Sequence, residues 1–275
     1  WTRPSGRMGA VAPAPDTSAR RITSLGLRPA GVEWSPDGQL LVFTADSSYR
    51  DELKYGSDEI FIAPREGKTR RITKNNDFDY SAPHFSPDGK WVLATRQIST
   101  DVVIARKMDN GGPTDLVLVP VDAGEERNLT ADWDYLPAGA RWSPDGKYVY
   151  FTGGVGGTTH LFRVSPNGGP VEQVTKGERR INGISFDAAM KTMAYSVGLT
   201  DMPPEIYVAN IDGSSERKLT NIHADFTREI ALSKSDRLQF KSKDGTPIEG
   251  WLMYPSGFHR DGRYPLVVLN HGGPH

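Results

Sequence analysis

The 275 residues carry 33 Lys and Arg against 34 Asp and Glu, which gives a formal net charge of −1, and 37% of them are hydrophobic. These values are typical of a globular protein and provide no basic excess for binding nucleic acid or an anionic membrane surface. The apolar runs are far shorter than the roughly 20 residues of a membrane-spanning helix. The chain has no cysteine, which excludes disulfides, thiol catalysis and thiolate metal sites.

The chain starts at Trp1 rather than Met, so we expect a mature or cut product. Its 29 glycines and 20 prolines, with almost no helical periodicity, indicate many short strands joined by tight turns.

A repeat organises the chain. An aromatic residue followed by Ser-Pro-Asp-Gly occurs at residues 34–38, 85–89 and 142–146, with a degenerate copy at residues 186–190. A second marker, an aliphatic residue followed by threonine, ends at residues 23, 73, 130, 175 and 220. Steps of 45 to 57 residues between these threonines are typical of propeller blades.

The third repeat shows the expected strands of one unit. Ser-Pro-Asp-Gly favours a type I turn, and the alternating residues 148–151 follow it as a strand. A third strand is expected at 161–164, a glycine-rich turn at 167–169, and a fourth strand that ends at Thr175. Four antiparallel strands in about 45 residues make a β-propeller blade.

The predicted fold is therefore mostly β, a partial β-propeller over residues 1–229. We predict four four-stranded blades at residues 30–73, 81–130, 139–175 and 181–220, and the tail of a fifth blade before residue 24. A propeller closes as a ring because open blades would expose sheet edges, so further blades are expected outside this sequence.

The loops between the second and third strands differ most in length. They cover residues 44–59, 95–115, 152–160 and 196–205. In a propeller these loops share one face with the loops between blades, and the Ser-Pro-Asp-Gly turns lie on the other face. Variable loops on one face favour a binding function there.

After Thr220 the repeat stops. Residues 238–242 and 248–254 predict a hairpin with a turn at 243–246, and residues 264–269 are continuously apolar, as in a strand covered on both faces. We therefore predict that residues 230–275 begin an α/β domain.

The segment from "SKDGTPIEGWLMYPSGF" to "YPLVVLNHGGPH" resembles the entry to the catalytic domain of the prolyl oligopeptidase family of serine peptidases. The acylaminoacyl-peptidase and dipeptidyl-peptidase-5-like branch is the most similar. The Ser-Pro-Asp-Gly blades resemble that family's propeller. The resemblance implies that residues 230–275 are the first strands of an α/β-hydrolase domain.

The same resemblance implies roles for the terminal loop. In α/β-hydrolases a His-Gly-Gly loop supplies part of the oxyanion hole, so the donor is expected to be the N–H of Gly273, with Gly272 shaping the loop and His271 structural. The family places its Ser, Asp and His further along the chain, and no Gly-x-Ser-x-Gly occurs here. The fragment alone is therefore expected to be inactive.

Two tetrapeptides in neighbouring inter-blade loops are similar, residues 77–80 (DFDY) and 132–135 (DWDY). We predict that Asp79, Tyr80, Asp134 and Tyr135 line a substrate cavity and that the acids hold the cationic amino terminus of a peptide. The alternative is ordinary Asx turns with aromatic residues that pack between blades.

Other motifs indicate no cofactor. The glycine-rich residues 153–159 precede a strand rather than a helix, so a hairpin loop is favoured over a phosphate loop. The six histidines show no ligand spacing, so no metal site is expected. Asn128 is the first residue of a glycosylation sequon that coincides with the repeat marker, so we interpret the sequon as a chance match.

These observations predict a serine-type exopeptidase or oligopeptidase, of the dipeptidyl or acylaminoacyl kind, that acts through an acyl-enzyme on short peptides. The expected partners are peptide substrates and the remainder of the catalytic domain, and homo-oligomers stay open. A periplasmic or secreted location is favoured over a cytoplasmic one. The alternatives are a TolB-like non-catalytic propeller, which leaves residues 238–275 unexplained, and an esterase of the same fold.

Overall fold

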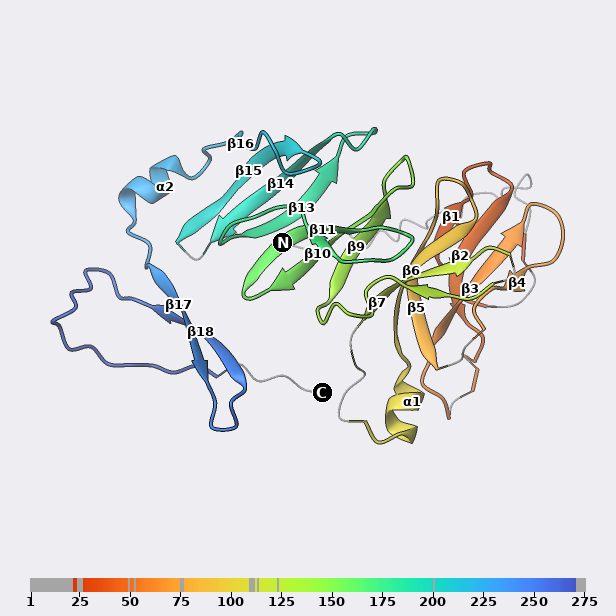
Figure 1. Ribbon diagram of the computed structural model, residues 1–275, viewed down its shortest axis with the longest axis horizontal. Helices are drawn as coiled ribbons and strands as arrows, with labels where there is room; N and C mark the ends of the chain where they lie inside the picture. The colour runs from red at the N-terminus through yellow and green to blue at the C-terminus, as the bar shows by residue number, and fades with distance from the viewer. Residues whose placement is uncertain are drawn as a thin grey trace, which may run out of the picture.

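The structure is a computed structural model (Figure 1). It describes residues 22–23, 27–48, 50–51, 53–74, 77–108, 112, 114–122, 124–199 and 201–270. The expected tail of a fifth blade falls mostly outside these residues. The oxyanion-loop residues, His271, Gly272 and Gly273, fall outside them entirely, so their assigned roles stay predictions.

The first two blades are separate four-stranded antiparallel sheets. The first comprises β1 (Ala30–Trp34), β2 (Leu40–Asp46), β3 (Asp58–Pro64) and β4 (Arg70–Arg71). The second comprises β5 (Phe78–Phe85), β6 (Trp91–Ile98), β7 (Asp115–Pro120) and β8 (Arg127–Asn128).

The third and fourth blades have the same strand order. The third comprises β9 (Pro137–Trp142), β10 (Val149–Val155), β11 (Thr158–Val164) and β12 (Glu172–Gln173). The fourth comprises β13 (Arg180–Phe186), β14 (Thr192–Leu199), β15 (Met202–Asn210) and β16 (Arg217–Lys218). A single parallel pairing, Thr159 with Arg180, joins the two sheets. The four predicted blades are confirmed, and the described sheets do not close into a ring.

Each Ser-Pro-Asp-Gly turn is held by its own side chains. In the first, Ser35 Oγ donates to Asp37 Oδ1 at 2.6 Å and accepts the N–H of Leu40 at 2.8 Å. The degenerate fourth copy makes the same turn with one residue, because Asp187 Oδ1 accepts the N–H groups of Lys191 and Thr192, both at 2.7 Å.

The hydrophobic core lies between successive blades. One cluster joins blades 1 and 2, a second joins blades 2 and 3, and a third joins blades 3 and 4. Phe85, the aromatic residue before the second turn, is 6% exposed, whereas Trp34 before the first turn is 45% exposed. No described blade precedes Trp34, so its ring has no neighbouring sheet to cover it.

The first strand of every blade carries a register shift where it pairs with the second strand. At each shift one residue has a positive φ, and these residues are Gly31 (61°), Ala82 (50°), Gly139 (61°) and Gly183 (59°). The shift is a repeated β-bulge, in which the left-handed position is taken by glycine in three blades and by alanine in the second.

The loops between second and third strands share a face with the inter-blade loops. The backbone N–H of Asp58, where β3 begins, donates to Asp79 Oδ1 in β5 at 2.7 Å. The second of these loops contains α1 (Thr100–Ala105). In blade 3 the loop is shorter than predicted, because β10 and β11 pair up to Val155 and Thr158 and leave only a two-residue turn.

After blade 4 the chain continues through α2 (Ala224–Glu229) into the predicted hairpin, β17 (Ser235–Lys241) paired with β18 (Pro247–Met253). In Figure 1 this hairpin and α1 project from the same side of the blades, at the lower left and lower right.

The predicted central strand over residues 264–269 is wrong for this structure. No strand follows Met253 in the described residues, and Leu266, Val267 and Val268 are 73, 78 and 68% exposed. An apolar run becomes a strand only when neighbouring strands satisfy its backbone N–H and C=O groups. No described segment of this chain pairs with it.

Candidate functional site

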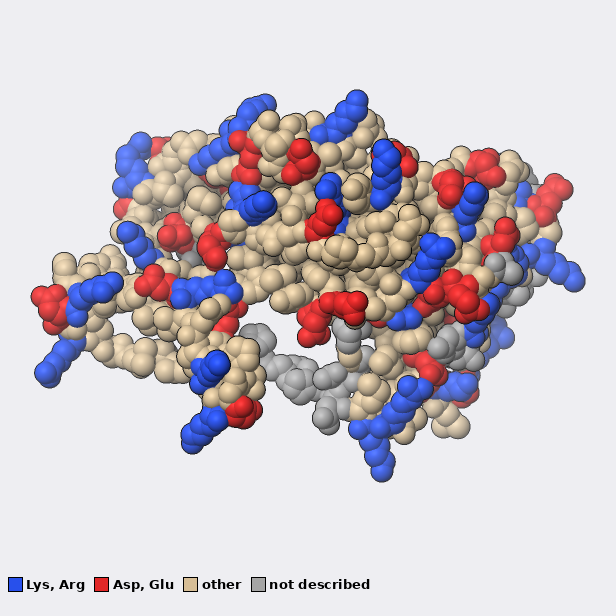
Figure 2. All heavy atoms as spheres, viewed as in Figure 1, with Lys and Arg blue, Asp and Glu red and all other residues tan. Residues whose placement is uncertain are grey.

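The variable loops gather on one face of the blades, which we call the loop face. The loop of blade 1 and helix α1 of blade 2 are joined there, because the N–H of Tyr55 donates to Asp101 Oδ1 at 3.2 Å. Arg106 at the end of α1 pairs with Asp77 at 2.5 Å. Acidic atoms lie along the lower margin of the blades, the side from which the hairpin and α1 project (Figure 2).

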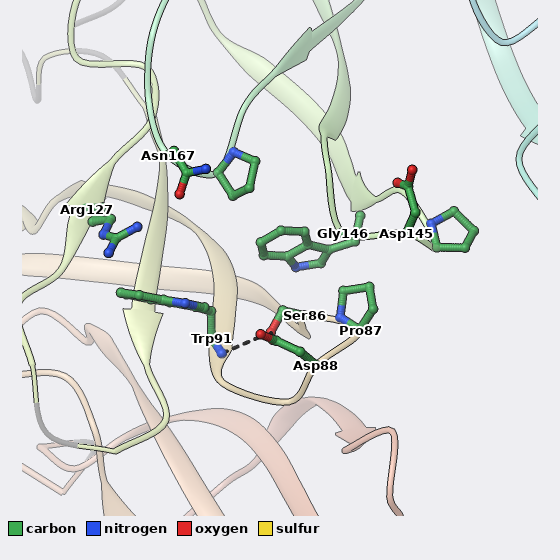
Figure 3. Close-up of a pocket in the computed structure, with 11 residues that line it drawn as sticks. Ser86, Pro87, Asp88, Trp91, Arg127, Asp145, Gly146 and Asn167 are labelled. Atoms are coloured by element: carbon green, nitrogen blue, oxygen red, sulfur yellow. Dashed lines mark hydrogen bonds between the residues drawn. The ribbon is translucent and has the colours of Figure 1, made fainter.

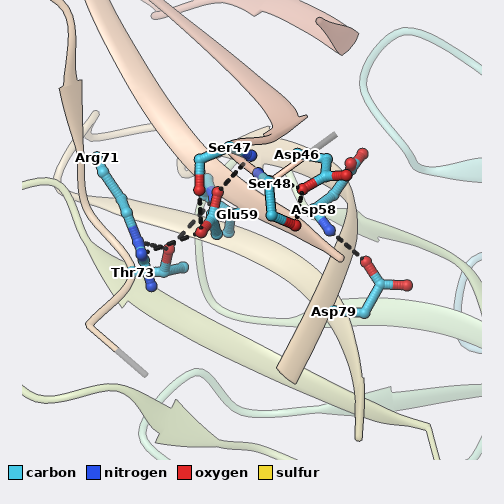
Figure 4. A network of polar contacts seen from close by, with 9 residues as sticks. Asp46, Ser47, Ser48, Asp58, Glu59, Arg71, Thr73 and Asp79 are labelled. Carbon is cyan, nitrogen blue, oxygen red and sulfur yellow. Dashed lines mark hydrogen bonds and ion pairs between the residues drawn. The ribbon is translucent and has the colours of Figure 1, made fainter. Parts of the chain in front are cut away.

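Asp79 is held by two donors on this face. Its Oδ1 accepts the N–H of Asp58, and its Oδ2 accepts the Gln97 side-chain amide at 3.2 Å. These bonds fix the carboxylate next to two further acids from blade 1, Asp46 and Asp58 (Figure 4).

Asp46, Asp58 and Asp79 form a group of like charges, which we call the acidic triplet. Burial raises the pKa of Asp58, and the nearby charges of Asp79 and Asp46 raise it further. Among the described residues, no Lys or Arg nitrogen lies within 4 Å of these three carboxylates. Glu59 next to them is different, because it pairs with Arg71 at 3.0 Å. The triplet therefore keeps negative charge available for a cation.

Tyr80 is buried in the core between blades 1 and 2, with 1% of its surface exposed. Its hydroxyl donates to Glu126 Oε2 at 2.9 Å, and burial raises the pKa of the phenol well above its usual range, with the charge of Glu126 adding to the shift. In this conformation the ring packs between blades and has no surface to offer a ligand.

Asp134 and Tyr135 lie on the surface before β9, and Tyr135 is 43% exposed. The ring of Tyr135 contacts Trp133 at a centroid distance of 5.3 Å. Trp133 in turn packs edge-on against Phe151 at 5.1 Å. Gly153 makes room for it, since a Cβ there would lie 2.4 Å from the Trp133 ring.

The two similar tetrapeptides do not occupy equivalent positions. Tyr135 lies seven residues before Trp142, the aromatic residue that precedes its turn. Seven residues before the equivalent Phe85 is Phe78, not Tyr80. Both inter-blade segments have 12 residues from the marker threonine to the aromatic residue, but the second tetrapeptide begins two residues earlier within its segment. The structure brings Asp79 together with other acids and leaves Asp134 apart from them in the neighbouring loop.

The hairpin contacts the loop face of blade 3. Arg237 in β17 pairs with Glu249 in β18 and lies 3.7 Å from Glu178 in the loop between blades 3 and 4. The Trp251 ring lies close to the β10–β11 turn, since a Cβ added at Gly157 would be 2.8 Å from it. The chain therefore leaves the propeller on the face that carries the acidic triplet.

The loop face has a repeated polar position that the sequence analysis missed. In each blade, one N–H of the third strand donates to the hydroxyl of the marker threonine. The residue just before that donor is polar in all four blades. These residues are Glu59, Asp115, His160 and Glu205. Aligning the blades on the threonines would have revealed them, because each lies 14 or 15 residues before its threonine.

His160 takes the place of the acid in blade 3. It is 3% exposed, and its Nδ1 lies 3.1 Å from Thr175 Oγ1. Burial lowers the pKa of its imidazole, and the charge of Arg179 lowers it further. Together with Glu178 and Arg237 it lines a cavity of about 310 Å³ where the hairpin meets the propeller.

Within the described part of the chain, no group of three or more His, Asp or Glu side chains is arranged to hold a metal ion. The helices among those residues are too short to cross a membrane.

Comparison with known proteins shows which proteins the chain resembles. No family model matches the sequence. Two curated relatives are the uncharacterized peptidase YuxL of Bacillus subtilis, 27% identical over 94% of this chain and 52% of its own length, and dipeptidyl-peptidase 5 of Porphyromonas gingivalis, 23% identical over 89% and 35%. The chain thus spans about a third to a half of the length of these relatives.

Two solved structures share the fold. An acylaminoacyl peptidase of Pyrococcus horikoshii matches with a TM-score of 0.60 at 21% identity, over 85% of this chain and 33% of its own. The β-propeller domain of the Trilobed protease from Pyrococcus furiosus matches with a TM-score of 0.50 at 19% identity, over 69% and 51%.

The chain is therefore similar to propeller-bearing peptidases in sequence, and to structures of that class in fold. The comparisons confirm the resemblance to the prolyl oligopeptidase family, which the Ser-Pro-Asp-Gly blades and the terminal hairpin motif had indicated.

Proposed function

We propose that this chain is the propeller and the beginning of the catalytic domain of a serine peptidase that hydrolyses short peptides through an acyl-enzyme. The observation that carries the proposal is the hairpin, which follows the blades directly and lies against their loop face. Relatives named as peptidases align over 94% and 89% of the chain.

In this proposal the propeller restricts access to the catalytic domain. The loop face, with its variable loops and the acidic triplet, borders the catalytic cavity, so peptides enter and folded proteins do not. The backbone N–H of Gly273 stabilises the oxyanion of the tetrahedral intermediate, and Gly272 lets the loop approach the substrate. The nucleophile and its partners belong to the part of the enzyme beyond this sequence.

The acidic triplet supplies substrate selection. A free peptide amino terminus is a cation at neutral pH, and Asp46, Asp58 and Asp79 present negative charge that no described Lys or Arg neutralises. Asp134 and Tyr135 add an acid and an exposed ring in the neighbouring inter-blade segment. This arrangement favours dipeptidyl release from a free amino terminus over removal of an acylated residue.

The test is a hydrolysis assay on the full-length gene product. Dipeptidyl p-nitroanilides, the matching N-acetyl compounds and p-nitrophenyl butyrate separate a dipeptidyl peptidase, an acylaminoacyl peptidase and an esterase. We expect turnover of the dipeptidyl compounds and its loss on treatment with diisopropyl fluorophosphate, whereas the 275-residue chain alone gives none. Hydrolysis of the ester alone would identify an esterase. Absence of all three activities would favour a non-catalytic propeller.

A further inference from the structure

A cavity of about 440 Å³ (Figure 3) opens on the turn face, which is the side of the propeller opposite the hairpin. It lies between blades 2 and 3 and is formed by two successive Ser-Pro-Asp-Gly turns and by the turn after β11. Two indole rings, Trp91 and Trp142, and three prolines, Pro87, Pro144 and Pro166, provide its apolar walls. We call it the Trp91 pocket. Cavities of this size hold small molecules or short peptide segments.

Two polar side chains of the Trp91 pocket, Arg127 and Asn167, have no hydrogen-bond partner among the described residues. The Arg127 guanidinium lies over the Trp91 ring, with its central carbon 4.3 Å from the ring centroid. Among the described residues, Arg127 has no carboxylate within 4 Å, and the side-chain amide of Asn167 makes no hydrogen bond. Both side chains point toward the opening between the indole of Trp91 and the turn after β11 (Figure 3).

At the equivalent position between blades 1 and 2 the arginine has partners. Arg70, like Arg127, opens the fourth strand of its blade, and it donates to the Val121 carbonyl at 2.5 Å and lies 3.7 Å from Asp122. Asp122 lies seven residues after Asp115, and Asn167 lies seven residues after His160. Asp122 and Asn167 therefore occupy equivalent positions in blades 2 and 3. Blade 3 thus replaces the acid that would engage the arginine with a neutral amide.

A second replacement gives the Trp91 pocket an aromatic wall. The fifth residue after the turn serine is Leu40 in blade 1 and Trp91 in blade 2. The indole provides a broad flat surface on which the guanidinium stacks, and it lines the cavity. The interface between blades 1 and 2 thus has an aliphatic side chain and an ion pair. The interface between blades 2 and 3 has a flat aromatic surface and free donors instead.

The charges around the pocket balance, which favours a neutral ligand. Asp88 and Asp145 line it, and each accepts a hydrogen bond from its serine, at 2.6 and 2.7 Å. Asp145 is also paired with Lys147 at 3.2 Å, so two cations, Arg127 and Lys147, stand against two carboxylates. The matching ligand has apolar rings for the indoles and neutral carbonyl acceptors for Arg127 and Asn167.

An extended proline-rich peptide has both features. A polyproline II helix makes no internal hydrogen bonds, so its carbonyl groups remain free to accept, and its pyrrolidine rings fit between aromatic side chains. We propose that the Trp91 pocket binds a proline-rich segment of another protein in the polyproline II conformation. This site lies on the face opposite the loop face and is independent of the proposed peptidase activity.

The experiment measures fluorescence anisotropy of fluorescein-labelled hexaproline titrated with the 275-residue chain. We expect saturable binding with a dissociation constant below about 1 mM, and no binding of a labelled Gly-Ser hexapeptide. Asn167→Asp restores the acid that blade 2 carries at residue 122, so its carboxylate engages Arg127. We expect this variant to bind at least about fivefold more weakly.

Two further variants complete the test. Trp91→Leu introduces the residue that blade 1 carries at position 40 and should also weaken binding at least about fivefold. Asp122→Asn makes the reciprocal change between blades 1 and 2 and should leave binding unchanged. Asn167 is a surface turn residue, so its variant remains informative if Trp91→Leu does not fold. Absence of saturation, equal binding by Asn167→Asp and the original chain, or equal binding of the Gly-Ser peptide would overturn the proposal.

Discussion

Glu205 shows how one side chain secures the end of a blade. It accepts hydrogen bonds from the hydroxyl of Thr220 and from the N–H groups of Ile222 and His223, the latter two at 3.0 and 2.9 Å. These bonds favour the charged carboxylate and lower the pKa of Glu205 to about 2. The carboxylate thereby fixes the path from the last blade into α2.

We predict that Glu205→Gln reduces the acid dependence of stability. Because the pKa in the folded protein lies below the ordinary value of 4.5, ionised Glu205 stabilises the fold above about pH 4.5, and this contribution disappears as the pH falls toward 2. Thermal melting between pH 2 and pH 6 should therefore show a smaller fall in Tm for the variant than for the original chain. Parallel curves for the two proteins would contradict the role of Glu205.

The repeated bulge allows a backbone test at two matched residues. A Cβ added at Gly139 or Gly183 would meet no atom within 4 Å, so an alanine there adds only the cost of a left-handed backbone. We predict that Gly139→Ala and Gly183→Ala each lower the free energy of unfolding by about 1 kcal/mol.

The reverse change at the same position of blade 2 serves as the control. Ala82 already has a φ of 50°, so Ala82→Gly relieves that backbone cost while increasing the entropy of the unfolded chain. We expect the free energy of unfolding, measured with urea, to stay unchanged or to rise by up to about 1 kcal/mol. A loss of stability in Ala82→Gly equal to that in Gly139→Ala would show that glycine conformation does not explain the bulge.

At the scale of elements, the hairpin depends on a close contact with the propeller. Arg237 pairs with Glu178 across the junction, and the Trp251 ring lies against the turn that contains Gly157. Much of the hairpin surface is exposed, so these contacts carry most of what holds it on the described blades. Steric change at that turn should displace the hairpin without unfolding the blades.

We predict that Gly157→Ala loosens the hairpin. Its Cβ would lie 2.8 Å from the Trp251 ring, whereas a Cβ at Gly168 would meet nothing within 4 Å; both glycines have a positive φ, 74° and 87°. Gly168→Ala is therefore a control with a similar backbone cost. Hydrogen exchange over β17 and β18 should become faster in Gly157→Ala and stay unchanged in Gly168→Ala. Equal exchange in both variants would contradict the contact.

At the scale of the whole molecule, the role that we propose for the acidic triplet requires the proposed catalytic domain. In the full-length protein we predict that Asp79→Ala lowers kcat/KM at least about threefold for dipeptidyl p-nitroanilides, with a smaller fall for Asp134→Ala. The reason is that Asp79 lies beside two further carboxylates and Asp134 does not. Compounds with an acetylated amino terminus should be much less affected, because they carry no cation.

The control for this experiment is Asp122→Asn, which changes an exposed acid on the opposite face. A change in kcat/KM below about twofold in both Asp79→Ala and Asp134→Ala would refute the role of these acids. The peptidase assay on the unchanged protein tests the proposed activity independently of that result.

The repeat predicted the blades because each turn is a local structure. Ser35 and Asp37 hold their turn whatever surrounds them, and the same chemistry recurs at Ser86 and Ser143. The hairpin was equally accessible, since its two alternating segments are joined by a tight turn at Gly245. Local hydrogen bonding sets these elements, so residue order alone indicates them.

The site was less predictable. The two tetrapeptides have nearly the same composition, yet Tyr80 lies in a core and Tyr135 on the surface, because the second tetrapeptide begins two residues earlier in its inter-blade segment. Burial depends on which blade packs against which, and that information is spread over residues some 50 positions apart. The acids that surround Asp79 come from a different blade and left no sign near it in the sequence.

By itself, then, the sequence determined the four blades, their turns and the hairpin, because each depends on contacts between residues close together in the chain. The tertiary structure alone decided which side chains meet across blades. It brought Asp79 next to Asp46 and Asp58, and it left Arg127 without the acid that engages Arg70. Both outcomes depend on how neighbouring sheets pack, and packing is settled by long-range contacts that no local motif encodes.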